Sequence, residues 1–174
     1  MDKELIMELT NIAPLEKWVK LEKEVVKRSC MDANAFDKDG VRISEFKHWA
    51  NKLCPSIKAT DKGQAFICAV AHMNIAALAA QKKDVVIEEC DAGLVKIVIP
   101  IFRDDEFIGS FACCGFLLDD GEVDSFMINK TTEIDEEEID RLSQDMQSIT
   151  SEQAEDLVGF IKSEIDKILN ESDT

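Results

Sequence analysis

The stretch that decides the fold runs from residue 85 to residue 118: VVIEECDAGLVKIVIPIFRDDEFIGSFACCGFLL. β-Branched and aromatic residues are concentrated at 85–87, 94–101 and 107–118, which predicts three strands. Asp104 and Asp105 predict a tight turn between the second strand and the third. Because strands joined by short turns pair antiparallel, this stretch predicts the centre of an antiparallel sheet.

The residues before this stretch predict a helix followed by a strand hairpin. Apolar residues recur at helical spacing behind Pro14, a residue tolerated at a helix start, which predicts an amphipathic helix over 14–28. A strand is expected over 31–36. The next four residues, Asp-Lys-Asp-Gly, have the composition of a tight turn, and 41–43 would return as a second strand.

Two further helices are predicted between this hairpin and the sheet. A short one is expected over 47–53, broken by Pro55. A longer one is expected over 61–81, where alanine and other apolar residues leave little polar face. We therefore expect the longer helix to be largely buried.

Helices are also predicted after the sheet. One is expected over 133–146, and another from Thr150, where Thr150-Ser-Glu-Gln153 has the spacing of a capping box. The last helix carries an apolar seam, made of Ala154, Val158, Ile161, Ile165 and Ile168. Such a seam is typical of a helix packed on its own domain or of a dimerising or output-linking helix.

The predicted elements form an α+β fold, an antiparallel sheet covered by helices with a C-terminal helix. We expect one domain over residues 1–148 and a C-terminal helix over 149–174. A chain of 174 residues is long enough to bury one sizeable core.

The charge of the chain is strongly negative and unevenly spread. The formal net charge is −16, and residues 119–174 carry 18 acidic and 4 basic side chains. Nucleic acids and anionic membranes attract basic surfaces, so neither is an expected partner.

No leader and no apolar segment of about 20 residues is apparent, which favours a cytoplasmic protein. Its six cysteines are then expected to be thiols, metal ligands or redox groups rather than disulfides.

A few residues of the chain resemble the frame of the PocR-type sensory domain. The shared positions are Leu53-Cys54, Cys68, Cys90-Asp91-Ala92-Gly93-Leu94, Pro100-Ile101, Gly109 and Gly115-Phe116. The resemblance implies a PAS-like and GAF-like sensing module of prokaryotic signalling proteins. It also implies a small organic ligand, a simple hydrocarbon derivative such as a small diol. Asp91 and Phe116 stand where the family pattern usually has histidine and glutamine, so the ligand of this chain is expected to differ.

The cysteines and one histidine also permit a metal site. Cys68 and His72 are four residues apart on one helix, so both can reach a single ion. With Cys54 and Cys90 they would suit zinc, and His72 by itself could hold haem. Cys113 or Cys114 could supply a further thiolate for an iron–sulfur cluster, although strand alternation lets only one of the two face such a centre.

A second interpretation of these cysteines is structural. No Cys-x-x-Cys motif is present, however, and free cysteine commonly lines pockets and cores as a small apolar group.

The sequence favours a sensor over an enzyme, because it contains no nucleophile elbow and no phosphate-binding glycine loop. We expect the ligand-binding residues to be Cys54, Cys68, His72, Cys90, Cys114 and Phe116. The signal would pass through the C-terminal helix to a signalling partner protein or within a homodimer. Two alternatives remain: a metal or redox sensor that holds zinc, an iron–sulfur cluster or haem, and an acidic adaptor that binds a basic protein.

Overall fold

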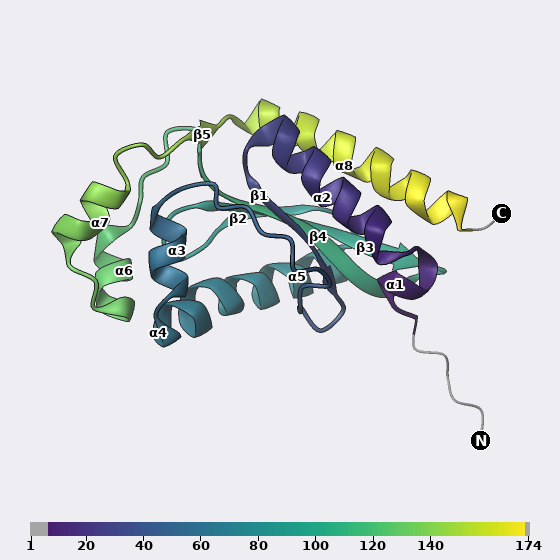
Figure 1. Ribbon diagram of the computed structural model, residues 1–174, viewed down its shortest axis with the longest axis horizontal. Coiled ribbons are helices and arrows are strands. Elements are labelled where there is room, and N and C mark those ends of the chain that lie inside the picture. The colour runs from purple at the N-terminus through teal and green to yellow at the C-terminus, as the bar shows by residue number, and fades with distance from the viewer. Residues whose placement is uncertain (1–6, 173–174) are drawn as a thin grey trace, which may run out of the picture.

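The computed structural model describes residues 7–172 as an α+β fold built on an antiparallel sheet, which confirms the predicted fold class (Figure 1). In this part of the chain the strand order is β1-β4-β3-β2, and β5 pairs in parallel with the end of β4. The strands are β1 (Asp32–Asp37), β2 (Val86–Glu89), β3 (Val95–Arg103), β4 (Glu106–Leu118) and β5 (Ser148–Ile149). The three antiparallel strands predicted within 85–118 are therefore present as β2, β3 and β4.

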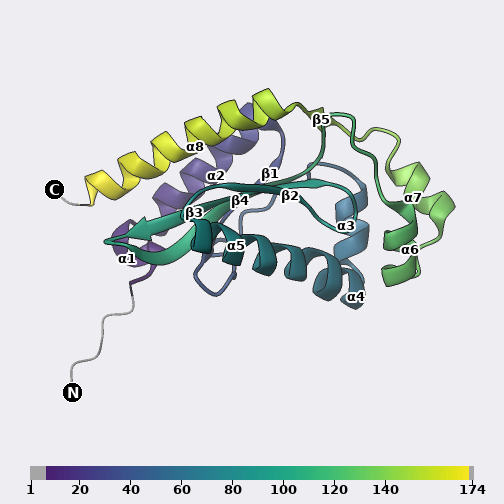
Figure 2. The ribbon, with the colours of Figure 1, turned by 180° about the vertical axis from the view of Figure 1, so that it is seen from behind.

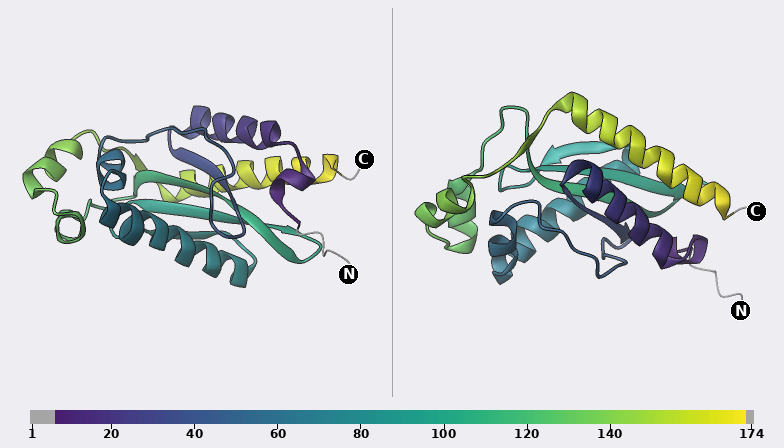
Figure 3. Two further views of the ribbon diagram at one scale, coloured as in Figure 1. Left: turned by 60° about the horizontal axis from the view of Figure 1, so that its bottom comes forward. Right: turned by 45° about the horizontal axis from the view of Figure 1, so that its top comes forward.

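Helices cover both faces of the sheet (Figures 2 and 3). They are α1 (Leu9–Ile12), α2 (Leu15–Ser29), α3 (Leu53–Lys58), α4 (Asp61–Gly63), the π-helix η1 (Gln64–Ala69), α5 (Val70–Lys82), α6 (Ser125–Thr132), α7 (Glu136–Leu142) and α8 (Ser151–Glu171). α2 and α8 lie side by side on one face, and α5 lies on the other. α6 and α7 lie together beyond one end of the sheet.

The main core lies between the sheet and the layer of α2 and α8. Trp18 is fully buried there and donates its Nε1–H to the Leu9 carbonyl oxygen at 3.0 Å. The seam of α8 belongs to the same core: Ala154, Val158, Ile161, Ile165 and Ile168. This seam thus packs on its own domain, while the boundary expected after residue 148 stays a prediction.

The return strand predicted over 41–43 is reduced to one isolated antiparallel bridge, between Phe36 on β1 and Arg42. The backbone N–H of Asp37 donates to the Val41 carbonyl oxygen at 2.8 Å, and the N–H of Ile43 donates to the Ala35 carbonyl oxygen at 3.2 Å. The hydroxyl of Ser44 instead donates to the carboxylate of Glu22 on α2. The backbone pairing along β1 therefore stops at Ile43.

The short helix predicted over 47–53 is also wrong, because α3 begins where that helix was expected to end. Pro55 lies in the first turn of α3, where its missing N–H leaves no hydrogen bond unmade. The backbone N–H of Cys54 donates to Asn51 Oδ1 at 2.7 Å and so pairs one free amide of this turn. Pro55 therefore lies in the first turn of a helix and does not end one.

The long helix expected over 61–81 is present as the continuous run of α4, η1 and α5, but it is not largely buried. Phe66, Val70 and Met73 are 59%, 41% and 61% exposed. One face of the run packs on β2 and β3, while its opposite side faces away from the sheet. The run Asp61–Lys82 is also the one helix of the described residues that is long and apolar enough to cross a membrane, contrary to the expectation that no apolar segment of about 20 residues occurs.

The helix expected over 133–146 is shorter in the structure, where it is α7 (Glu136–Leu142). α6 lies before that range and ends at Thr132, and its C-cap residue Glu133 takes a left-handed φ of 65°. Strand β5 follows, and two residues are too few to show a strand pattern in the sequence. The predicted capping box is confirmed, since the side chains of Thr150 and Gln153 each pair with the other's backbone N–H at the start of α8.

Candidate functional site

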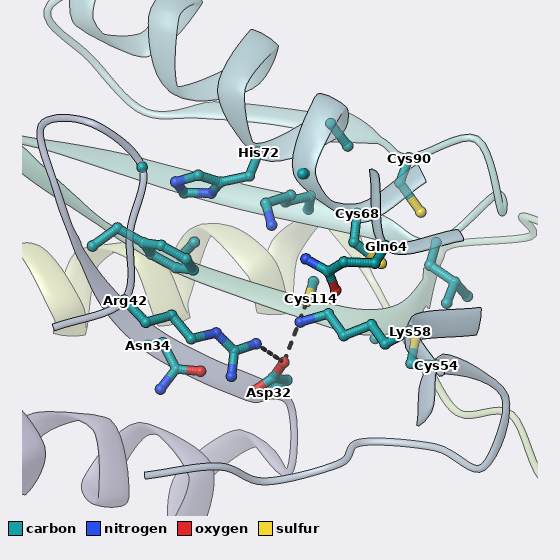
Figure 4. Close-up of a pocket in the computed structure, with 18 of the residues that line it drawn as sticks. Asp32, Asn34, Arg42, Cys54, Lys58, Gln64, Cys68, His72, Cys90 and Cys114 are labelled. Atoms are coloured by element: carbon teal, nitrogen blue, oxygen red, sulfur yellow. Dashed lines mark hydrogen bonds and ion pairs between the residues drawn. The ribbon is translucent and has the colours of Figure 1, made fainter. Parts of the chain in front are cut away.

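A cavity of about 440 Å³ lies between the sheet and the run from η1 into α5. Its volume falls in the range of about 300–1,000 Å³ that is usual for small-molecule sites. The side chains around it come from strands, helices and the loop after β1 (Figure 4). They include Asp32, Asn34, Phe36, Arg42, Trp49, Asn51, Cys54, Lys58, Gln64, Cys68, His72, Cys90, Leu94, Lys96, Ala112 and Cys114.

Strand β1 supplies one wall of the cavity. Asp32, Asn34 and Phe36 line it, whereas Ala33 and Ala35 lie in the main core. This alternation follows from the two-residue period of a strand. The edge strand of the sheet therefore presents two polar groups and one ring to the cavity.

The central strands supply the floor. Lys96 on β3 and Cys114 on β4 line the cavity, while Ile97 and Cys113 point into the main core. The expectation that only one of the two adjacent cysteines faces the site is therefore confirmed in the geometry. The same two strands have the cavity on one face and the core beneath α8 on the other.

Phe116 is the predicted site residue that the structure does not bring to the cavity. The register shifts here, because Lys96 pairs with Cys114 but Val95 pairs with Phe116, which leaves Gly115 as an extra residue. Gly115 has a φ of 101°, which favours glycine. The bulge reverses the alternation of faces, so Phe116 lies in the main core.

The other predicted residues do meet around one space. Cys68 and His72 line it from one helix face, together with Gln64 at the same four-residue spacing. Gln64 and Cys68 lie in the π-helical segment, a distortion often found at functional sites. Cys54 reaches the cavity from α3 and Cys90 from the end of β2.

The cysteine thiols of the cavity are held in their neutral form. All six cysteines of the chain are free. Burial raises the pKa of Cys54, Cys68 and Cys90, and it raises the pKa of Cys114 to about 11. Within residues 7–172 no three His, Cys, Asp or Glu side chains are grouped so that they could hold a metal ion. The predicted metal ligands thus line one cavity without forming such a group.

The imidazole of His72 is buried and lacks a hydrogen-bond partner. Its ring stacks on Phe36 with 3.8 Å between centroids, and neither ring nitrogen pairs with another described group. Burial, followed by the charges of Lys96, Arg42 and Lys58, lowers the pKa of His72 to about 3. The ring is therefore neutral at physiological pH.

This shift predicts a loss of stability in acid. Because the pKa of His72 is 6.5 when unperturbed and about 3 in the fold, the unfolded chain binds the extra proton between these values. The contribution is complete above about pH 6.5 and declines as the pH falls towards 3, by at most about 1.4 kcal/mol per pH unit. Urea unfolding across this range should show a shallower acid decline for His72→Gln than for the native chain.

The half-buried His48 offers a control for this measurement. Its Nε2 lies 3.1 Å from the Cys30 carbonyl oxygen, outside the cavity. The His48→Gln variant should keep the steep decline of the native chain. Equal slopes for the native chain and His72→Gln would contradict a buried neutral imidazole.

Two acceptors of the β1 wall also have no hydrogen-bond partner among residues 7–172. Asp32 Oδ2 lies 3.6 Å from the guanidinium of Arg42 and 3.7 Å from the Sγ of Cys114, but Asp32 Oδ1 has no hydrogen bond (Figure 4). Asn34 donates through Nδ2 to the Phe46 carbonyl oxygen at 2.9 Å, while its Oδ1 is unpaired. Buried polar atoms are normally paired, so these two mark places for a donor.

Sequence reasoning missed the charged lining of the cavity. Asp32, Arg42, Lys58 and Lys96 were not predicted as site residues. One signal was available, because Lys96 is the single charged residue in the otherwise apolar stretch 94–102. Only its pairing with Cys114 across the sheet connects it to the cysteines.

Comparison with known proteins finds a match at the level of the family. The chain matches the model of the sensory domain found in PocR over residues 11–173. No curated protein and no solved structure matches it.

Proposed function

Because the chain belongs to the family of PocR sensory domains, we propose that it senses a small organic molecule bound in the cavity between β1, β3, β4 and the α5 helix. The chain is a sensory domain of a signalling system. The cavity is the observation that carries the proposal, since it joins a suitable volume with a few polar groups set in a mostly apolar wall.

The polar groups support a ligand that carries a hydrogen-bond donor. Asp32 Oδ1 and Asn34 Oδ1 are unpaired acceptors, and the ring of His72 offers a further unpaired nitrogen. The unpaired state of such atoms costs about 1–3 kcal/mol each, which a bound hydroxyl would relieve. The neutral thiols would face the hydrocarbon part of the ligand.

We further propose that the signal leaves through α8, towards a partner protein or a second copy. The sheet offers a route, because β3 and β4 carry cavity residues on one face and core residues on the other. Ligand binding can shift the helix only by favouring one of two arrangements, typically by about 1–3 kcal/mol. The apolar seam of α8 is occupied by its own core, so a partner would meet the polar face.

A titration of the isotope-labelled full chain tests the site. Short alcohols, diols, carboxylates and amides at millimolar concentration are the probes, and backbone amide signals give the readout. At least one probe is expected to shift the signals of Cys68, Cys90 and Cys114. Shifts confined to residues outside the cavity would overturn the proposal.

The cysteines themselves provide a mutational prediction. Cys68→Ser and Cys90→Ser are expected to weaken binding of the best probe at least tenfold, because a hydroxyl adds a hydrogen-bonding group to the apolar wall. The free energy of unfolding should fall by about 1 kcal/mol or less. Calorimetric titration and urea unfolding measure the two effects.

Cys30 gives the matched control, because it is exposed and lies outside the cavity. Cys30→Ser should bind the probe as the native chain does. Full affinity in both Cys68→Ser and Cys90→Ser would rule out a ligand against the thiol wall.

A further inference from the structure

The lining of the cavity contains more positive than negative charge in its buried part. Arg42, Lys58 and Lys96 contribute cations, whereas the carboxylates are Asp32, which faces Arg42, and the exposed Asp39. Asp32 therefore partly balances the guanidinium, and its charge also acts on Lys58, whereas no carboxylate of the described residues pairs with Lys96. A buried charge without a partner is costly, so this imbalance needs a cause.

Lys96 is the most buried of these three cations. Only 9% of the residue is exposed, and it lines the floor of the cavity from β3. Among residues 7–172 no hydrogen bond or ion pair reaches its ammonium group, whose Nζ lies 5.7 Å from the centre of the Phe36 ring. Lysine is rarely this buried unless a negative group pairs with it.

Lys58 acts on the same part of the cavity. Its side chain extends from α3 into the space beside Cys114 and Gln64 (Figure 4). Lys58 and Lys96 line the same cavity as Cys68 and His72. Burial, followed by the charge of Arg42, lowers the pKa of Lys58, as expected for cations that share one enclosure.

We infer that the ligand of this cavity is a small carboxylate, whose anionic end pairs with Lys96 and Lys58 while its short hydrocarbon part lies against the thiols. This inference rests on the function proposed above and specifies the ligand class. Two ammonium groups suit a carboxylate through charge-assisted hydrogen bonds. Arg42, whose planar fork would suit a phosphate best, is already turned to Asp32.

The inference differs from the neutral ligand that the family resemblance implies. A diol would fill the cavity and satisfy the acceptors of the β1 wall, but it would leave the charge of Lys96 uncompensated. A hydroxycarboxylate would satisfy both the acceptors and the cations, because its hydroxyl could pair with Asp32 or Asn34 and its carboxylate with the lysines.

Matched pairs of acid and amide test this inference on the full chain. The probes are propionate compared with propionamide and lactate compared with lactamide, at constant ionic strength and neutral pH. The readouts are calorimetry and the backbone amide signals of the isotope-labelled protein. The carboxylates are expected to bind in the cavity at least tenfold more tightly than their amides. Lys96→Met should weaken carboxylate binding about 10- to 100-fold and weaken amide binding much less.

Further variants keep the test decisive. Methionine matches lysine in length, and Lys58→Gln provides a second, less buried change should Lys96→Met fail to fold. Lys130→Met, on the exposed surface of α6, is the matched control and should bind as the native chain does.

Each outcome separates the two proposals. Equal binding of amide and acid within the cavity, or undiminished carboxylate binding in the lysine variants, overturns the carboxylate and keeps the sensor pocket. Shifts outside the cavity overturn both. If none of the four probes binds, the inference of a carboxylate ligand is overturned. The titration with alcohols and diols then still tests whether the cavity binds a small organic molecule.

Discussion

Replacing Ile161 with alanine is expected to destabilise the protein by about 2–5 kcal/mol. Ile161 is fully buried in the core between α8 and the sheet. The substitution removes apolar burial and leaves a cavity that rigid strands and α2 can fill only in part. Urea unfolding followed by circular dichroism measures the change.

Gly159, on the same helix, offers a control for which the expected change in stability has the opposite sign. It is exposed, and an added Cβ would meet no atom within 4 Å. Gly159→Ala should therefore stabilise the protein by about 0.5–1 kcal/mol, because alanine loses less backbone entropy in a helix. A cost below about 1 kcal/mol for Ile161→Ala would contradict the packing of α8 on the sheet.

The same core bears on the boundary predicted after residue 148. A chain that ends there would lose the whole seam of α8 and expose the apolar side chains beneath it. We expect such a chain to lose cooperative unfolding, since the core would be incomplete. A shortened chain that unfolds cooperatively would instead show that the sensory domain and the C-terminal helix are separate folding units.

Replacing Glu22 with alanine is expected to destabilise the protein by about 2–4 kcal/mol. Its carboxylate is fully buried and accepts from the backbone N–H of Ala35 at 3.1 Å and from Asn34 Nδ2 at 3.3 Å. It also accepts from the hydroxyl of Ser44, which fixes the segment that leaves the edge of β1. Without Glu22 the amide of Ala35 would be buried and unpaired, and the wall of the cavity at Asn34 would loosen.

The pH dependence of this effect separates charge from hydrogen bonding. Burial raises the pKa of Glu22 above 4.5, although hydrogen bonds from Ser44, Ala35 and Asn34 oppose it. With a raised folded pKa, the contribution is complete below about pH 4.5 and declines as the pH rises through the folded value. The Glu22→Gln variant keeps an acceptor and cannot ionise. Relative to the native chain, it should gain stability as the pH rises from about 4 to 8.

Urea unfolding at several pH values tests both Glu22 variants. Glu138→Ala is a suitable control, because that carboxylate is half-exposed and pairs only with Arg141 on its own helix. It should cost less than about 1 kcal/mol. A similarly small loss for Glu22→Ala would mean that water takes over the hydrogen bonds of Glu22.

Much of the fold could be predicted because its signals are local. The β-branched runs around Asp104 and Asp105 specify β3 and β4, and the capping box specifies the start of α8. The misplaced elements lie where tertiary contacts outweigh local pattern. The return strand is reduced to a single bridge where the hydroxyl of Ser44 donates to Glu22. Pro55 lies in the first turn of a helix in which Asn51 pairs the amide of Cys54.

The candidate site was predictable only in its cysteines and histidine. Cys68 and His72 share a helix face at a spacing of four, which the sequence contains directly. Phe116 was misplaced because one extra residue, Gly115, reverses the alternation of the strand, and a bulge has no clear sequence signal apart from the glycine.

The sequence by itself determined an α+β fold, its central antiparallel strands, its C-terminal helix and its membership of a sensory family. Only the tertiary structure decided that the α8 seam faces its own core and that Lys96, Lys58 and Asp32 share a cavity with the cysteines. The physical reason is the range of the interactions. Strand and helix formation depend on neighbours a few residues apart, whereas the cavity is made by segments that meet only when β1 pairs with β4 and the α5 helix packs across them.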